Sequence, residues 1–345
     1  VKVLRIQSDA ESVAKSVMKS ARSVSNPAGA GAGAAEAGGG AGSDQDLGDV
    51  SEAVLAELRQ EADMMARVAH HEHIVRFVGV IERPFQAVVT EFMARGSLER
   101  LLVSPGPGNL RHLFTLRDVT AMACGAAAGI LHLHEERVIH RDIAARNLLC
   151  DHSDRVRVCD FGFARLKQSS QSRGYTSATT GPIRWLAPEA LMTSGKTFSE
   201  KSDVWSFGVT LTELFTGQPP WKGVETLQVA IQVCSGARQA LPLALPTSIR
   251  DLVQRCWAAD PSERPTMRDV HRLLSRSLAL LEAHPAAGSI PLRTLDDARD
   301  AMPAALQLAE EEEAAGRRRQ AEEAEAAAEA AEAAAEAAAE GAPAG

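Results

Sequence analysis

The sequence lacks the signs of several classes of protein. Its five cysteines include no CxxC pair, which argues against a disulfide framework or a zinc site and fits free thiols in a reducing compartment. No apolar run reaches the length of about eighteen residues that a membrane-spanning helix needs. The chain also begins without a signal-peptide pattern. We therefore expect a cytoplasmic location and no membrane span in this chain.

A charge excess of one sign is also missing from most of the chain. The 345 residues carry a formal net charge of −8. From Asp300 onward, eleven Glu and one Asp stand against three Arg, so this end accounts for the whole excess. A nearly neutral body indicates neither a nucleic-acid partner nor a membrane surface. The acidic end predicts a solvated tail.

The order of apolar patterns predicts two lobes. Strand-like patterns dominate the first part, and helical spacing dominates after residue 96. Residues 21–49 are mostly Ala, Gly and Ser, which predicts a flexible insert. Together these patterns predict an α+β fold with a small strand-rich lobe and a larger helical lobe. The strand-like runs are 1–6, 73–81 and 86–92, and the helical runs are 50–68, 116–135, 199–217 and 247–258.

The signals of a packed core end near residue 283. Residues 304–340 are mostly Ala and Glu, which favour a helix. No Leu or Ile repeats along one seam there, so we expect a monomer and not a coiled-coil dimer. The prediction is one domain over residues 1–282, followed by an Ala/Glu-rich helical or disordered tail over 283–345.

Five short motifs follow one another in the second half of the chain. They are HRDIAARN at 140–147, DFG at 160–162, APE at 187–189, SDVWSFG around Asp203 and DPSERP around Arg264. Over roughly residues 51–281, this ordered set resembles the catalytic domain of eukaryotic protein kinases. The resemblance implies a two-lobed kinase fold with a complete helical C lobe. It also implies ATP and Mg²⁺ as cofactors and a protein as substrate.

The resemblance assigns roles to individual residues. Phosphoryl transfer requires a protein mainly to position groups and to neutralise charge. The Asp142 carboxylate would accept the proton of the attacking hydroxyl, and Asn147 and Asp160 would supply oxygen ligands to Mg²⁺. Glu189 and Arg264 would form a buried, structural ion pair. The adenine ring would contact Thr90 at the back of its pocket, backbone groups of Glu91 and Met93, and Leu149 beneath the ring.

Three positions bear on which hydroxyl is phosphorylated. Ala144 stands where serine/threonine kinases usually have Lys, and Pro182 stands where they have Thr. Arg146 supplies the cation instead, which is similar to tyrosine kinases. Some tyrosine-kinase-like serine/threonine kinases share these features, so both specificities stay open, with tyrosine favoured. Tyr175 is the only tyrosine and lies between DFG and APE; we hypothesise that its phosphorylation would order this loop by pairing with Arg141.

One part of the kinase pattern is missing. No Gly-rich G-x-G-x-x-G-x-V motif precedes residue 90. Residues 1–4 resemble the end of the third kinase strand, which would make Lys2 the phosphate-binding lysine. Its partner would be Glu61 on the next helix, with Glu57 as the alternative. We expect an N-terminally truncated sequence with poor affinity for ATP. Two functions remain open: an active kinase, or a pseudokinase, scaffold or inactive fragment that acts by binding.

Overall fold

The computed structural model describes residues 2–4, 59–60, 62–81, 87–160, 165–166, 183–192, 197–297 and 302–340. Within these ranges the chain forms two compact units, Val1–Met93 and Ala94–Gly345. Several predictions lie outside the described residues. They concern the insert over 21–49, the glutamates Glu57 and Glu61, Phe161 and Gly162 of DFG, Tyr175 and Pro182.

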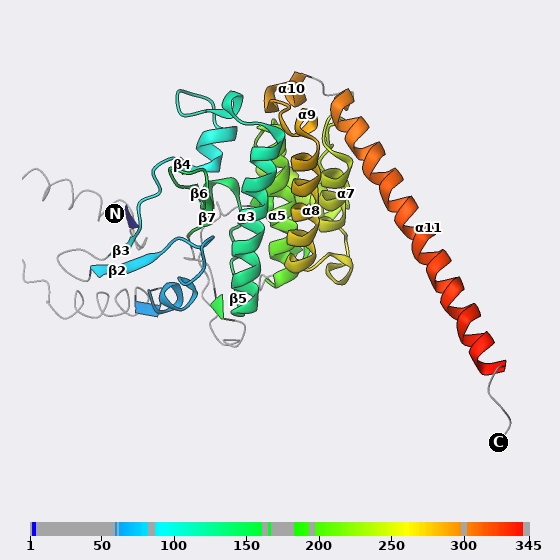
Figure 1. Ribbon diagram of the computed structural model, residues 1–345. Helices are drawn as coiled ribbons and strands as arrows, with labels where there is room; N and C mark the ends of the chain where they lie inside the picture. Colours follow the sequence, from blue (N-terminus) through cyan, green and yellow to red (C-terminus); the bar gives the residue numbers. More distant parts are fainter. Residues whose placement is uncertain are drawn as a thin grey trace, which may run out of the picture. The chain divides into compact units, whose positions relative to one another are not determined.

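The first unit contains a three-stranded antiparallel sheet in the order β1-β3-β2. Its strands are β1 (Lys2–Leu4), β2 (Phe77–Ile81) and β3 (Ala87–Thr90), so each predicted strand-like run contains one observed strand (Figure 1). The central strand β3 buries Val88 completely, as expected for a strand with neighbours on both edges. A helix over 62–68 buries Met65 and Val68.

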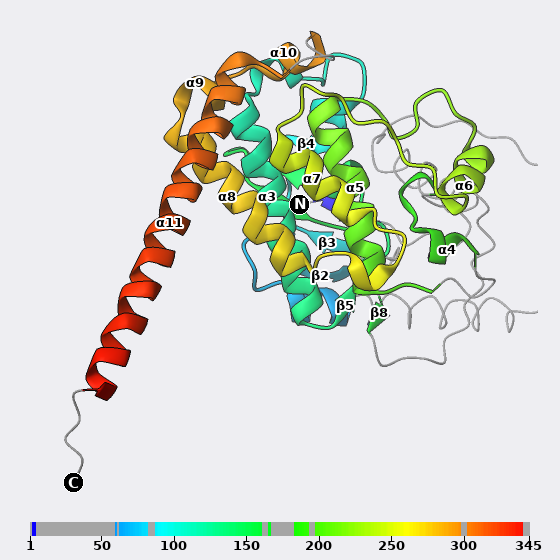
Figure 2. The same ribbon diagram turned by 90° about the vertical axis from the view of Figure 1, so that its right-hand side faces the viewer.

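The second unit is built on long helices. α3 (Leu116–Glu135) lies against α8 (Met267–Ala283), and α5 (Glu200–Thr216) contacts both α3 and α7 (Thr247–Cys256) (Figures 1 and 2). Nearly every side chain of α5 is buried, which is typical of a helix at the centre of a larger protein. The predicted helices 116–135, 199–217 and 247–258 are confirmed.

Local sequence signals set the ends of these helices. The hydroxyl of Thr115 accepts the N–H of Asp118 at 3.3 Å, and the Asp118 carboxylate accepts the Thr115 N–H at 2.9 Å, which forms a capping box at the start of α3. α5 ends at Gly217, whose φ of 63° is in the left-handed region that favours glycine. The buried guanidinium of Arg111 donates to the carbonyls of Leu214 and Phe215 at 2.8 and 2.7 Å, which satisfies the last turn of α5.

Short elements bring the HRDIAARN segment into the helical unit. A small sheet has the order β4-β6-β7, and β5 pairs with β8. The strands are β4 (Gly96–Ser97), β5 (Val138–Ile139), β6 (Leu148–Cys150), β7 (Val156–Val158) and β8 (Arg165–Leu166). The remaining elements are η1 (Glu99–Val103), η2 (Arg111–Leu113), η3 (Ala145–Asn147), η4 (Ile183–Trp185), α4 (Pro188–Met192), α6 (Thr226–Cys234), η5 (Pro261–Glu263), α9 (Pro285–Gly288) and α10 (Leu292–Asp297).

The packed core extends beyond residue 283. Leu292 and Leu295 of α10 are buried, as are Leu306 and Ala309 of the C-terminal helix α11 (Ala304–Glu340). The first turns of α11 contact α8 and α9, and the helix then continues away from these helices (Figures 1 and 2). Of the two predicted states of the acidic tail, the helical one is present over residues 304–340, and its beginning belongs to the core.

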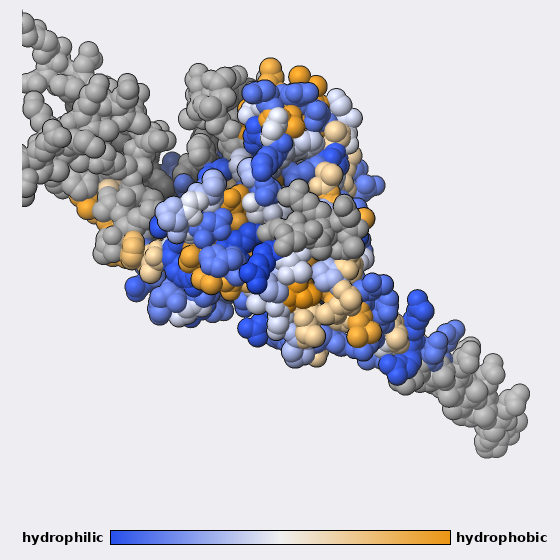
Figure 3. Space-filling view, turned by 90° about the horizontal axis from the view of Figure 1, so that it is seen from above, coloured by the Kyte–Doolittle hydropathy of each residue, from blue (hydrophilic) through white to orange (hydrophobic). Residues whose placement is uncertain are grey.

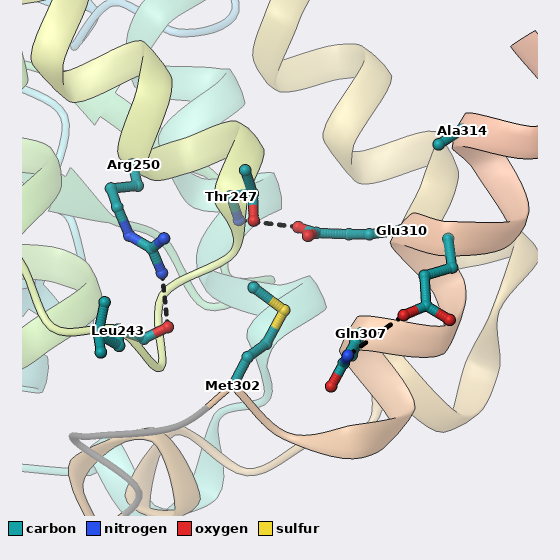
Figure 4. Close-up of a pocket in the computed structure, with 8 residues that line it drawn as sticks. Leu243, Thr247, Arg250, Met302, Gln307, Glu310 and Ala314 are labelled. Atoms are coloured by element: carbon teal, nitrogen blue, oxygen red, sulfur yellow. Dashed lines mark hydrogen bonds between the residues drawn. The ribbon is translucent and has the colours of Figure 1, made fainter.

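A polar contact also joins α11 to α7. The backbone N–H of Thr247, in the first turn of α7, donates to the Glu310 carboxylate at 2.8 Å (Figure 4). α7 has no side-chain cap of its own, because its N-cap residue is Pro246. Glu310 therefore satisfies a helix N-terminus from a distant part of the sequence. The contact lies at the edge of a shallow pocket lined by Leu243, Arg250, Met302, Gln307 and Ala314 among others (Figure 4).

One face of the described part of the chain is mostly polar. Hydrophilic residues predominate on the face shown in Figure 3, with smaller groups of hydrophobic residues between them. Leu227 and Ile231 of α6 and Met192 of α4 are exposed apolar side chains. Within the described ranges, no helix combines the length and the apolar character needed to cross a bilayer.

Candidate functional site

The HRDIAARN segment is fixed to the central helix α5 by Asp203. Its carboxylate accepts the backbone N–H groups of His140 at 2.8 Å and of Arg141 at 2.9 Å, and the His134 Nε2 atom lies 3.0 Å away. The Asp203 side chain is only 1% exposed. A buried carboxylate is tolerated when donors surround it. The loop backbone is thus attached to a rigid element directly before Asp142.

Asp142, Arg146 and Asn147 lie together, as the sequence predicts. The Asn147 side-chain amide donates to the Asp142 carbonyl at 2.7 Å and to its carboxylate at 2.8 Å. The Arg146 guanidinium forms an ion pair with the other carboxylate oxygen. Asp142 is 7% exposed and Asn147 is 6% exposed. The turn η3 allows these contacts, because the Asn147 N–H donates back to the Ala144 carbonyl at 2.9 Å.

The segment that leads to Asp160 is bonded to the same loop. The Cys159 N–H donates to the Asn147 carbonyl at 3.0 Å, and the His140 Nε2 atom lies 3.1 Å from the Cys159 carbonyl. Asp160 itself has a φ of 66°, in the left-handed region that non-glycine residues rarely adopt. Such strain persists only where the surroundings enforce it, and it is frequent at functional sites.

The donor atoms at this point suit a hard divalent cation. The amide nitrogen of Asn147 is engaged by Asp142, which leaves its side-chain oxygen available, and Asp160 contributes a carboxylate. Within the described residues, no group of three or more His, Cys, Asp and Glu side chains is arranged to hold a metal. Mg²⁺ typically takes only one or two protein carboxylates beside phosphate oxygens and water. Asn147 and Asp160 therefore fit it.

A further buried acid, which the sequence analysis did not identify, lies beside this loop. Glu213 of α5 accepts the Trp185 indole N–H at 2.7 Å and the Ala145 backbone N–H at 3.2 Å. Burial raises the pKa of Glu213 to about 7, although both hydrogen bonds act to lower it. The Arg146 guanidinium lies 4.7 Å from the centre of the Trp185 ring. A single charged residue inside the otherwise uncharged helical stretch 204–216 was the signal available in the sequence.

The predicted ion pair between Glu189 and Arg264 is confirmed. The Arg264 guanidinium donates to the two carboxylate oxygens of Glu189 at 2.7 and 2.9 Å. It also donates to the carbonyls of Ala258 and Lys201 at 2.9 and 3.0 Å. Arg264 is 1% exposed, so these donors are satisfied out of water. The pair holds the APE segment against the loop before α8.

The predicted nucleotide-binding residues of the first unit lie on or next to its sheet. Lys2 of β1 is paired in register with Thr90 of β3, so the structure brings their backbones together. The Thr90 hydroxyl donates to the Glu91 carbonyl at 3.3 Å, and the Glu91 N–H donates to the Arg76 carbonyl at 3.0 Å. Met93 is buried. In the second unit, Leu149 is a buried residue of β6.

Comparison with known proteins gives consistent matches. The family model described as protein tyrosine and serine/threonine kinase matches residues 48–274. The serine/threonine-protein kinase STY17 of Arabidopsis thaliana is 34% identical over 66% of this chain and 38% of that protein. The tyrosine-protein kinase Srms of Homo sapiens is 38% identical over 62% and 42%, and the tyrosine-protein kinase abl-1 of Caenorhabditis elegans is 39% identical over 63% and 17%. The chain thus spans less than half the length of each of these relatives.

Proposed function

The chain belongs to the family of protein tyrosine and serine/threonine kinases, and we propose that it transfers the γ-phosphate of ATP to a hydroxyl group of a protein substrate. The observation that carries this proposal is the buried Asp142 carboxylate, oriented by Asn147 and paired with Arg146. The α+β fold with a helical C-terminal unit agrees with the family.

Asp142 is suited to accept the proton of an attacking hydroxyl. Its carboxylate is oriented from two sides, by the amide of Asn147 and the guanidinium of Arg146. Each carboxylate oxygen has two lone pairs, so both contacts still leave an acceptor position for a hydroxyl. A base that is held in place before the substrate arrives contributes to catalysis through orientation.

The cofactors follow from the family and from the donor atoms. We infer that Asn147 and Asp160 hold Mg²⁺, which neutralises phosphate charge when it is bound with ATP. For the nucleotide we infer roles for Lys2 and Glu61 at the phosphates. The residues proposed to contact the adenine are Thr90, Glu91, Met93 and Leu149.

We propose tyrosine as the favoured acceptor. Ala144 is completely buried and supplies no cation at the position where serine/threonine kinases usually have Lys. The cation next to Asp142 is Arg146, which stacks on Trp185, two residues before the APE motif. A cation held over the Trp185 ring is compatible with the long phenolic side chain of a tyrosine acceptor. The relatives include both tyrosine and serine/threonine kinases, so the preference requires a direct test.

A transfer assay tests both parts of the proposal. The purified chain is incubated with labelled ATP, Mg²⁺ and peptide libraries that offer Tyr, Ser or Thr as the single acceptor. We expect label on tyrosine peptides and a loss of about 100-fold or more in Asp142→Asn, because that amide is no proton acceptor. Equal label with both proteins would contradict the role of Asp142. The reactions contain saturating ATP, because the sequence predicts poor affinity for this nucleotide. A folded wild-type chain that then transfers nothing would favour the alternative function, a pseudokinase, scaffold or inactive fragment that acts by binding.

A further inference from the structure

Three elements meet at the Glu213 carboxylate. α5 supplies Glu213 itself, η4 supplies the indole of Trp185, and η3 supplies the backbone N–H of Ala145. Both donors reach the same oxygen of Glu213, at 2.7 Å from the indole and 3.2 Å from the backbone. The acid is 1% exposed. Because a buried carboxylate is costly without donors, these two contacts fix its orientation.

The contacts continue from Trp185 to the proposed base. The ring of Trp185 lies under the Arg146 guanidinium at 4.7 Å, a cation–π distance. The same guanidinium is paired with the Asp142 carboxylate. Glu213 therefore contacts the Arg146 region in two ways. It accepts the indole N–H of Trp185, on which Arg146 rests, and it accepts the backbone N–H of Ala145, the residue before Arg146.

We propose that Glu213 is a positioning residue that keeps the segment around Trp185, where the acceptor side chain of a peptide substrate would lie, in a fixed relation to the loop that carries Asp142. This inference rests on the proposed function, in which Asp142 accepts the proton of the substrate hydroxyl. Glu213 needs no contact with the substrate, because it acts through Trp185 and Ala145.

Glu213 and its hydrogen bonds from Trp185 and Ala145 form a bridge between η4 and η3. The Glu213 carboxylate in this bridge changes its charge near neutral pH. Burial is the largest cause of the raised pKa of Glu213, about 7, and the negative charge of Glu99 in η1 also raises it. The hydrogen bonds from Trp185 and Ala145 and the positive charge of Arg146 lower it. An ionised carboxylate accepts stronger hydrogen bonds than a neutral one, so the bridge tightens as Glu213 loses its proton.

Steady-state kinetics separate a positioning role from a structural one. The variants are Glu213→Ala, Glu213→Gln, which retains an acceptor oxygen, and Thr212→Val as the matched control. Thr212 is its buried neighbour, and its hydroxyl donates only within α5, to the Val209 carbonyl at 2.7 Å. We expect Glu213→Ala to lower kcat/KM for the peptide by about 10- to 100-fold with an unchanged KM for ATP.

In the same assay Glu213→Gln should recover most of this loss, and Thr212→Val should retain the wild-type value per folded molecule. If Glu213→Ala lowers the melting temperature as Thr212→Val does but keeps its kcat/KM for the peptide, the positioning role is refuted. A wild-type chain without transfer would instead refute the proposed function. The contact between Glu213 and Trp185 is then tested by a measurement that needs no activity.

That measurement is the indole N–H signal of Trp185 in a ¹H–¹⁵N spectrum. The chain has four tryptophans, so the signal is assigned by its absence in Trp185→Phe. In the wild type we expect it to shift with a midpoint near the Glu213 pKa of about 7. In Glu213→Gln, whose amide does not titrate, this shift should vanish. An identical titration in both proteins would show that Trp185 does not sense Glu213 and would overturn the inference.

Discussion

The buried carboxylate of Asp203 in α5 accepts the backbone N–H of His140, the residue that follows β5, at 2.8 Å. A second N–H, from Arg141, reaches the other carboxylate oxygen at 2.9 Å. Arg141 has a φ of 70°, so this carboxylate holds the loop in a conformation that a non-glycine residue rarely adopts. The backbone that presents Asp142 thus depends on one acid of α5.

Asp203→Asn should destabilise the protein strongly. The substitution replaces one carboxylate oxygen by an NH₂ group. This group faces a backbone N–H, so two donors meet and a buried polar group is left unpaired. We expect a loss of about 2–4 kcal/mol in the free energy of unfolding by urea denaturation. The control is Asp251→Asn, an exposed acid of α7, which should stay within about 0.5 kcal/mol. Equal effects of the two variants would contradict the role of Asp203.

The ion pair between Arg264 and Glu189 should depend on the shape of its cation. In the wild type, two donors of the Arg264 guanidinium bind the two oxygens of Glu189. Arg264→Lys keeps the positive charge but loses this paired arrangement of donors. Because the site is buried, we expect a loss of about 2–4 kcal/mol. Arg272→Lys is the matched control: Arg272 pairs with Asp269 on an exposed helix face, where about 1 kcal/mol or less is expected. A similar loss from both, in thermal and urea unfolding, would refute the argument.

The raised pKa of Glu213 predicts how stability changes with pH. The folded protein holds the Glu213 proton more tightly than the unfolded chain, with a pKa of about 7 against 4.5. The resulting stabilisation is complete below the unfolded value and is lost as pH rises through the folded value. The stability of the wild type relative to Glu213→Gln should therefore fall between about pH 4.5 and pH 7, by up to about 3 kcal/mol. A difference that is independent of pH would contradict this prediction.

Residues that carry local signals were predictable from the sequence. Thr115 and Ser199 are capping residues, and the helices that follow them begin within one residue of the predicted positions. The family resemblance assigned Asp142, Arg146 and Asn147 to one site, and the three residues lie together in the structure. The pairing of Glu189 with Arg264 followed from the family resemblance alone.

Contacts between distant segments could not be predicted in this way. The helix that contains Glu213 is predictable from its sequence pattern. The two hydrogen-bond donors of Glu213 come from η3 and η4, and no local sequence signal connects these elements to Glu213. Arg111 of η2 donates to the end of α5, although α3 and α4 lie between these two elements in the sequence. In α11, the buried Leu306 and Ala309 are too few to stand out in an Ala/Glu-rich composition. Only tertiary packing distinguishes them from their neighbours.

The contact of Glu310 with α7 gives the last prediction. Glu310 accepts the Thr247 N–H at 2.8 Å, at a helix start that lacks a side-chain cap, and its negative charge lies at the positive end of the helix dipole. Removing such a cap typically costs about 1 kcal/mol, so Glu310→Ala should lower the melting temperature by a few degrees.

Glu311→Ala is the matched control on the same helix. Glu311 is exposed and accepts only a hydrogen bond from Gln307 of α11 itself, at 3.2 Å, so its loss should change stability by less than about 0.5 kcal/mol. Salt should reduce the difference between the two variants, because part of the Glu310 effect is electrostatic and near the surface. If both variants unfold at the same temperature, α11 does not cap α7.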